Sequence, residues 1–162
     1  MTLIDEDENV PSWKKSKHFL SKHQNIIGIK EAVDDFRRIR ELIDITQISD
    51  DFSVFSGDDP TFLESMNLGA HGVISVAANV IPRSISMICR NVLNSELNEA
   101  NNLNDINKNL YKLLFVESNP IPVKWMLFKM GLIKNIIRLP LIQLDETFHD
   151  EVLSELNKLR LI

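Results

Sequence analysis

Three short segments rich in isoleucine, valine and phenylalanine alternate with amphipathic segments in the first half of the chain. The apolar segments are residues 26–29, 52–55 and 72–76. Each carries β-branched or aromatic residues and precedes a segment of helical character, which predicts repeated βα units. Strands of a parallel sheet are buried on both faces, so near-continuous apolar runs are expected in them. The pattern therefore predicts an α/β fold with three parallel strands.

Helical periodicity occupies the segments around these strands. Residues 13–23 predict an exposed helix that leads into the first strand. Residues 34–45 predict a helix that lies on the sheet, because one stripe carries its apolar side chains, Phe36, Ile39, Leu42 and Ile43. After the second strand, residues 57–60 offer a turn, a cap and a first-turn proline for a further helix, and Gly69 offers its stop.

The strand pattern ends after Asn79, and the remaining residues predict helices separated by proline-containing loops. These helices are expected at residues 82–97, 99–115, 120–130 and 146–159. The asparagine-rich stretch 91–109 is polar, yet its leucines and isoleucine still recur at helical spacing. That stretch is therefore predicted to be helix and not a linker.

Composition and charge place the chain among ordinary globular proteins. Its 162 residues are 44% hydrophobic and 25% charged, and the net charge of -5 disfavours a nucleic-acid binder, which needs a basic face. Lysine and arginine interrupt every long apolar stretch, so no membrane span is expected, and the acidic start resembles no targeting segment. The single cysteine, Cys89, argues against a disulfide framework and fits a reducing compartment, so a cytoplasmic location is expected.

Lys30 is the first candidate for chemistry, because it follows the first apolar run at the place where α/β proteins carry catalytic groups. An amine held against apolar walls is less stable in its charged form, and the neutral amine can attack a carbonyl to form a Schiff base. The alternative is a lysine whose flexible stem reaches water, which is the commoner case at strand ends. Glu31 points to the opposite side of a strand and is expected to pack or pair against a helix.

Other candidates carry weaker signals. Residues 56–59 end the second strand and residues 77–79 the third, where glycine allows close approach of a ligand, but turn formation and capping explain these residues equally well. His71, in the loop before the third strand, is expected to be structural or exposed, and Cys89 to be a buried, inert thiol. The chain has no metal-ligand spacing, phosphate-binding loop or dinucleotide fingerprint, so neither a metal nor a cofactor is expected.

Four strings carry a family resemblance. They are IIGIKEA around Lys30, SGDDPTFLESMNLGAHGVISVAANVIPR from Ser56, LFVESNPIPVKW from Leu114 and RLPL from Arg138. In this order, and from about Asn9 to the end, they resemble the carboxyl-terminal half of the 4-hydroxy-tetrahydrodipicolinate synthase (dihydrodipicolinate synthase) family. Sister lyases such as N-acetylneuraminate lyase share a Gly-Ile-Lys element but typically lack HGVISVAANV and NPIPVKW, so the synthase family is favoured.

The resemblance implies a (β/α)8 TIM barrel, of which residues 1–98 would be the carboxyl-terminal half, about strands 6 to 8. Residues 99–162 would be the helical extension that helps assemble a homotetramer. The family condenses pyruvate with aspartate semialdehyde in lysine biosynthesis. By resemblance, Lys30 forms the Schiff base with pyruvate, the main chain of Ile74 contacts the pyruvate carboxylate or its neighbourhood, and Gly57 is the close-approach glycine that ends the seventh strand.

The sequence also departs from the family pattern. Where the family has a proton-relay tyrosine followed by Asn-Val-Pro-Ser-Arg, this chain has Glu8 and, in place of the substrate-binding arginine, Trp13. Strands one to four, with the other relay residues and the lysine feedback site, are not in the sequence. General acid–base assistance alone is worth about 10²–10⁴-fold in rate. We therefore expect a truncated chain with little activity alone, either an inactive remnant or a half-barrel interaction piece completed by another chain.

Overall fold

The computed structural model describes residues 25–46 and 52–162, which belong to two compact units, residues 1–74 and residues 75–162. The helix predicted over residues 13–23 and the positions Glu8 and Trp13 lie outside the described residues. The division predicted after residue 98 concerns the barrel and the extension of the family, and it stays a prediction.

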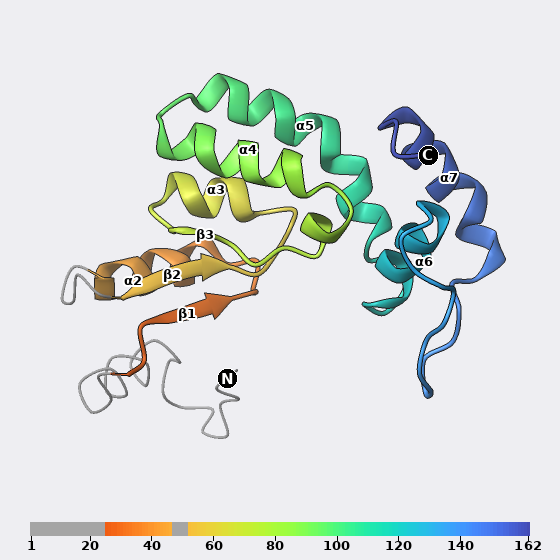
Figure 1. Ribbon diagram of the computed structural model, residues 1–162. Helices are drawn as coiled ribbons and strands as arrows, with labels where there is room; N and C mark the ends of the chain where they lie inside the picture. Colours follow the sequence, from red (N-terminus) through yellow and green to blue (C-terminus); the bar gives the residue numbers. More distant parts are fainter. Residues whose placement is uncertain (1–24, 47–51) are drawn as a thin grey trace. The chain divides into compact units, whose positions relative to one another are not determined.

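The first unit contains a three-stranded parallel sheet in the order β1-β2-β3 (Figure 1). Its strands are β1 (Gly28–Glu31), β2 (Ser53–Ser56) and β3 (Gly72–Val73). The β1–β2 ladder pairs Lys30 with Phe55 and Glu31 with Ser56, and the β2–β3 ladder pairs Phe55 with Gly72. The expectation of three parallel strands in an α/β arrangement is confirmed.

Helix α2 (Phe36–Thr46) covers one face of this sheet. Leu42 of α2 packs with Phe52 and Val54, and Ile26 and Ile29 extend this apolar cluster. The stripe predicted for this helix is confirmed at its centre, where Ile39 and Leu42 are buried. Because side chains alternate along a strand, the shared contacts of Ile29 and Val54 define the α2 face of the sheet.

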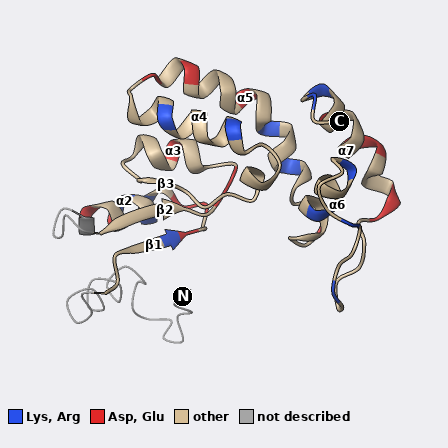
Figure 2. Ribbon diagram, in the orientation of Figure 1, with Lys and Arg blue, Asp and Glu red and all other residues tan. Residues whose placement is uncertain are grey.

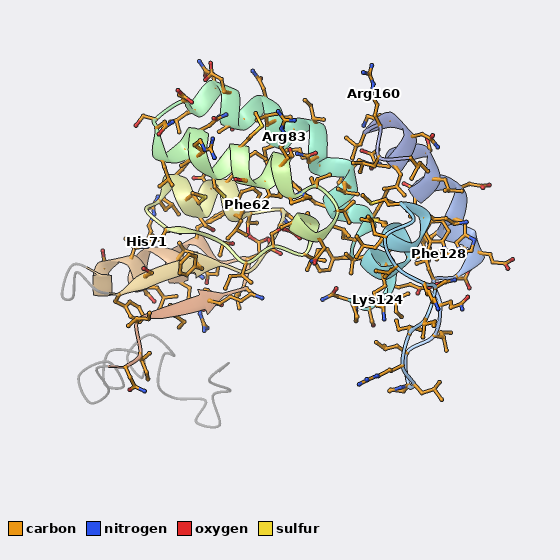
Figure 3. The ribbon with its side chains drawn as sticks, viewed as in Figure 1. Phe62, His71, Arg83, Lys124, Phe128 and Arg160 are labelled. Atoms are coloured by element: carbon orange, nitrogen blue, oxygen red, sulfur yellow. The ribbon has the colours of Figure 1, made fainter. Side chains whose placement is uncertain are left out.

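Helix α3 (Phe62–Asn67) packs against β2 and β3. Its first residue, Phe62, is fully buried and anchors the helix (Figure 3). The helix ends where the sequence predicts, because Gly69 adopts a φ of 114°, a left-handed conformation that side chains rarely allow.

Two strand boundaries differ from the prediction. β1 runs through Lys30 to Glu31 and does not stop before the lysine, because its ladder with β2 continues to Ser56. β3 has only two residues, and residues 77–79, which the sequence placed at the end of this strand, form the 3-10 helix η1 (Ala77–Asn79). The Ser75 hydroxyl accepts a hydrogen bond from the Ala78 amide at 2.8 Å, which favours the turn over an extended strand.

The second unit is helical (Figure 1). After η1 it contains α4 (Pro82–Leu93), α5 (Leu97–Leu113), α6 (Ile121–Lys129), the 3-10 turn η2 (Glu146–Phe148) and α7 (His149–Lys158). α5 packs against both α4 and α7, and α6 packs against α7. The four predicted helices are confirmed, although the first ends early, where Ser95 takes a positive φ of 65° between α4 and α5. Within the described ranges, the helices are too short or too polar to cross a membrane.

The core of the second unit combines leucine packing with a buried polar network. Leu110, Met126 and Leu156, from three different helices, are fully buried. In the asparagine-rich α5, the Tyr111 hydroxyl donates to Asn104 Oδ1 at 3.2 Å. The neighbouring Asn107 amide donates to Ser84 Oγ of α4 at 2.7 Å and to the Leu103 carbonyl at 2.8 Å. These bonds satisfy polar groups that burial would otherwise leave costly.

Ring stacking joins α6 to the start of α7. The His149 ring stacks on Trp125 with centroids 4.4 Å apart, and His149 Nε2 lies 3.1 Å from the Leu144 carbonyl. Just before η2, the Asp145 carboxylate accepts hydrogen bonds from the Thr147 hydroxyl and amide at 2.7 and 2.9 Å. These two bonds hold the pKa of Asp145 below its usual range.

Candidate active site

The three residues predicted to form the site lie at the carboxyl ends of the three strands in the first unit. Lys30 is the third residue of β1, Gly57 follows β2 and Ile74 follows β3. The Gly57 amide donates to the Glu31 carbonyl at 2.7 Å, and the Ile74 amide donates to the Ser56 carbonyl at 2.8 Å. Backbone hydrogen bonds therefore tie the three positions together at the carboxyl ends of the parallel strands, where α/β folds bind ligands.

Alternation along β1 separates Lys30 from Glu31. A basic and an acidic position follow each other at the end of β1 (Figure 2). Glu31 lies on the α2 face, where it is buried, pairs with the Arg38 guanidinium of α2 and accepts a hydrogen bond from the Val33 amide at 3.1 Å. The expected pairing of Glu31 against a helix is confirmed. Lys30 projects from the opposite face together with its ladder partner Phe55.

The Lys30 stem runs across Gly57. A Cβ atom built on Gly57 would lie 2.4 Å from Lys30 Cε and 3.1 Å from Lys30 Cγ, both well inside van der Waals contact. The same atom would lie 2.9 Å from the Cβ of Ala32. The bare glycine therefore provides the space that the lysine occupies. The Lys30 side chain is exposed, so the described residues do not form the apolar walls that a desolvated amine requires.

The open face beside Lys30 is apolar. Phe55 contributes its ring, and a Cβ on Gly72 would meet that ring at 3.4 Å. Ile74 is 51% exposed at the edge of this face. Its amide already donates to Ser56, so a carboxylate bound here would need other hydrogen-bond donors. The expected main-chain contact of Ile74 with pyruvate stays a prediction.

The polar residues after β2 build a turn. Ser56 is buried, and its hydroxyl accepts from the Asp58 amide at 3.3 Å. Asp58 Oδ2 accepts from the Thr61 hydroxyl and amide at 2.6 and 3.1 Å and so supports the entry to α3. These contacts agree with the turn and capping interpretation of residues 56–59.

The surroundings of His71 and Cys89 indicate structural and not chemical roles. His71 directly precedes β3 (Figure 3); its Nδ1 accepts a hydrogen bond from the Val54 amide at 3.2 Å, and its ring lies 6.5 Å from that of Phe55. A structural role for His71 is therefore confirmed. Cys89 is half-buried, and burial raises the pKa of its thiol, which lowers the thiolate fraction. The thiol is therefore less buried than expected, while the direction of its pKa agrees with the low reactivity predicted for it.

Sequence reasoning missed Ala32 as a neighbour of the site. Its Cβ shares the space above Gly57 with the lysine stem. The sequence spacing could have indicated this contact. Ala32 comes directly after β1 and two residues after Lys30, so the two side chains are expected on the same side of the chain.

A parallel sheet whose strands alternate with helices, with a lysine at its carboxyl end, defines an α/β protein. Residues 15–159 match the Dihydrodipicolinate synthetase family, so the chain belongs to that family. The 4-hydroxy-tetrahydrodipicolinate synthase of Stutzerimonas stutzeri is 49% identical over 131 residues, which are 81% of this chain and 44% of that protein. The chain spans less than half the length of this curated relative.

Solved structures agree with this assignment. The crystal structure of dihydrodipicolinate synthase from Aquifex aeolicus superposes with a TM-score of 0.88 at 34% identity, covering 94% of this chain and 54% of that one. The chloride-inhibited dihydrodipicolinate synthase from Acinetobacter baumannii, solved with pyruvate, gives a TM-score of 0.84 at 42% identity, covering 91% and 50%. These neighbours are TIM-barrel enzymes, and this chain has the fold of part of such a barrel.

Proposed function

We propose that this chain carries the Schiff-base lysine of a lyase that condenses pyruvate with aspartate semialdehyde in lysine biosynthesis. The Lys30 amine would attack the keto carbon of pyruvate, forming a C–N bond, and the carbonyl oxygen would leave as water. The imine acidifies the adjacent methyl group, and the resulting enamine carbon would attack the aldehyde carbon of the semialdehyde. The observation that carries this proposal is the convergence of Lys30, Gly57 and Ile74 at one strand edge.

We assign β1, β2 and β3 to strands 6, 7 and 8 of the family barrel. The parallel order and the position of Lys30, Gly57 and Ile74 at successive strand ends support this assignment. The helices after residue 98 are assigned to the carboxyl-terminal extension, which the helical character of α5, α6 and α7 supports. Because Lys30 itself provides the electrophilic imine, the reaction needs no metal or other cofactor.

Catalysis is expected to require the part of the family barrel that this sequence does not contain. In the first unit the open face of the sheet leaves Lys30 and Ile74 exposed. Acid–base groups and carboxylate donors for pyruvate would come from barrel strands facing this surface, as would the walls that exclude water. We propose the amino-terminal half of a family barrel as this partner, held on another polypeptide or in further sequence of the same one.

Association of complete subunits would use the second unit. Its segment between α6 and α7 exposes large apolar side chains, namely Leu132, Ile136, Leu139 and Ile142. Exposed apolar groups in this number are typical of contact surfaces. On this basis we propose the homotetramer that the family resemblance implies. A cytoplasmic location stays a prediction, which rests on the single cysteine.

Borohydride trapping tests the role of Lys30. The chain is incubated with pyruvate, reduced and digested, and the Lys30 peptide is weighed by mass spectrometry. We expect a reduced pyruvate adduct on Lys30 that Lys30→Arg abolishes, because a guanidinium does not form the imine. Lys108→Arg is the matched control, since Lys108 lies exposed on α5 and pairs with Asp105. The proposal would be contradicted if no adduct formed on the chain alone and none formed after a separately expressed amino-terminal half was added.

The same preparation separates catalysis from mere association. With the amino-terminal half of a relative added, we expect turnover of pyruvate and aspartate semialdehyde, measured by loss of pyruvate. Binding of that half without an adduct or turnover would instead favour the non-catalytic interaction piece.

A further inference from the structure

We infer that Gly57 is a positioning residue for Lys30. Because glycine has no side chain, it leaves the space through which the lysine stem crosses the strand end and directs its amine toward the site. This inference rests on the proposed function of Lys30 but gives Gly57 a different task from the one expected. The resemblance implies a glycine that lets a substrate approach the backbone. In the structure, the space above Gly57 is already filled by the chain's own lysine.

The geometry links the two residues directly. The Gly57 amide donates to the Glu31 carbonyl at 2.7 Å, so the backbone beside the lysine is fixed. A Cβ at Gly57 would lie 2.4 Å from Lys30 Cε and 3.1 Å from Lys30 Cγ, so two parts of the stem pass over the glycine. Any side chain at position 57 must therefore push the stem aside and redirect the Nζ atom. Because the stem is flexible, the displacement changes the direction of the amine more than the stability of the sheet.

Ala32 introduces a second, structural contact that must be separated from the first. Its Cβ lies 2.9 Å from the position of a Cβ at Gly57 and cannot swing away, because it is attached to the backbone. Gly57→Ala therefore has two expected effects, a redirected lysine and a strained strand pair. Ala32→Gly removes the second effect alone.

Gly72 offers a matched control on the neighbouring strand. It lies on the same face of the sheet, opposite Phe55 in the ladder. A Cβ at Gly72 would meet the Phe55 ring at 3.4 Å, an ordinary van der Waals distance, and the closest contacts of that Cβ do not include the lysine. Gly72→Ala therefore adds the same methyl group to the same face without touching the lysine stem.

The experiment compares the unmodified chain with Gly57→Ala, Gly57→Ala/Ala32→Gly and Gly72→Ala. The first readout is the rate of borohydride-trapped pyruvate adduct on Lys30 across a pH series. The second is acetylation of Lys30 by an N-hydroxysuccinimide ester, measured relative to Lys108 in the same molecules, which requires no pyruvate. Thermal unfolding monitors the strand pair.

Gly57→Ala is expected to slow trapping by about 10²-fold, the usual consequence of misplacing a reacting group by about 1 Å. Its acetylation ratio should rise, because the displaced stem is freer to reach the ester. The Ala32→Gly change should restore the unfolding temperature but leave both Lys30 readouts altered, and Gly72→Ala should match the unmodified chain.

Equal Lys30 readouts in Gly57→Ala and Gly72→Ala would overturn the positioning role, as would recovery of all readouts by Ala32→Gly. If the unmodified chain traps no pyruvate, either alone or with an amino-terminal half added, the proposed function fails. The acetylation ratio then still decides whether Gly57 directs Lys30.

Discussion

The two units differ in how completely their secondary structure is covered. The sheet of the first unit is packed by α2 on one face, while the other face presents Lys30 and the half-exposed Ile74. In the second unit, Leu110, Met126 and Leu156 are fully buried among packed helices. Stable folds are built from layers that cover each other's apolar faces. Among the described residues, the helices of the second unit therefore cover one another, whereas in the first unit a core lies on the α2 face only and the Lys30 face carries no further layer.

Replacing one leucine in each unit tests this contrast with the largest expected effect on stability. Leu→Ala at a buried site costs about 2–5 kcal/mol, with the higher values where the cavity cannot collapse. We expect Leu110→Ala to lie near the upper end and Leu42→Ala near the lower end, because the cluster around Leu42 lies in a sheet with an open face. Denaturant unfolding followed by circular dichroism measures both costs. A larger cost for Leu42→Ala would show that the first unit is the better packed one.

The ion pair on the covered face of the sheet should contribute less. Glu31→Gln keeps the shape and the bond from Val33 but removes the charge that pairs with Arg38. We expect a loss of about 1–3 kcal/mol, the contribution of a hydrogen bond between charged groups when one of them, here Glu31, is buried. Asp35→Asn is the control, since its pair with Arg37 is solvent-exposed and the asparagine can still accept the hydrogen bond from the Arg37 amide at the start of α2. Equal unfolding midpoints for the two variants would mean that the α2 face is as open as the Lys30 face.

The polar network in the second unit should have a smaller effect. Tyr111→Phe removes the hydroxyl that donates to the buried Asn104 and should cost about 1 kcal/mol. Asn101→Ala on the same helix is the control, because the Asn101 amide donates to the Leu97 carbonyl at an exposed position. Urea midpoints of the two variants give the comparison. No difference between them would mean that solvent reaches Asn104.

Ionisation of the Cys89 thiol should change the free energy of unfolding least, and its effect should depend on pH. Burial raises the pKa of this thiol above its unfolded value, so its contribution to stability is complete below the unfolded pKa and is lost as pH rises through the folded one. Alkylation by iodoacetamide in mildly alkaline buffer should therefore be slower in the folded chain than in urea. Equal rates would indicate that α4 exposes its thiol fully.

Much of the framework could be predicted from local sequence. The opposite faces of Lys30 and Glu31 follow from strand alternation, and the end of α3 follows from Gly69, which adopts the left-handed conformation. The short β3 could not be predicted, because the hydrogen bond of the Ser75 hydroxyl competes with an extended strand that the apolar residues favour. The bond between Tyr111 and Asn104 was also hidden, since an asparagine on a helix is equally suited to solvent.

The candidate site was predictable as a set of strand ends but not as a packed arrangement. Lys30 and Gly57 are distant in sequence, and only the β1–β2 register brings the lysine stem over the glycine. The contact of Ala32 with the same space depends on that register as well. Sequence spacing predicts the face of the strand on which each residue lies, whereas the contacts between residues of neighbouring strands follow only from the three-dimensional structure.

The alternation along β1 has a consequence for how this strand can change over time. Lys30 faces the open side and Glu31 pairs with Arg38 on the other, so the two neighbours hold opposite charges on opposite faces. Deleting one residue early in the strand would move Glu31 over Gly57, put Ala32 in the position that pairs with Arg38, and turn Lys30 into the apolar position of Ile29 on the α2 face. The lysine stem over Gly57 and the ion pair with Arg38 would both be lost in one step. A change of length in β1 is therefore expected to disturb both faces of the sheet at once, whereas a single substitution alters only one face.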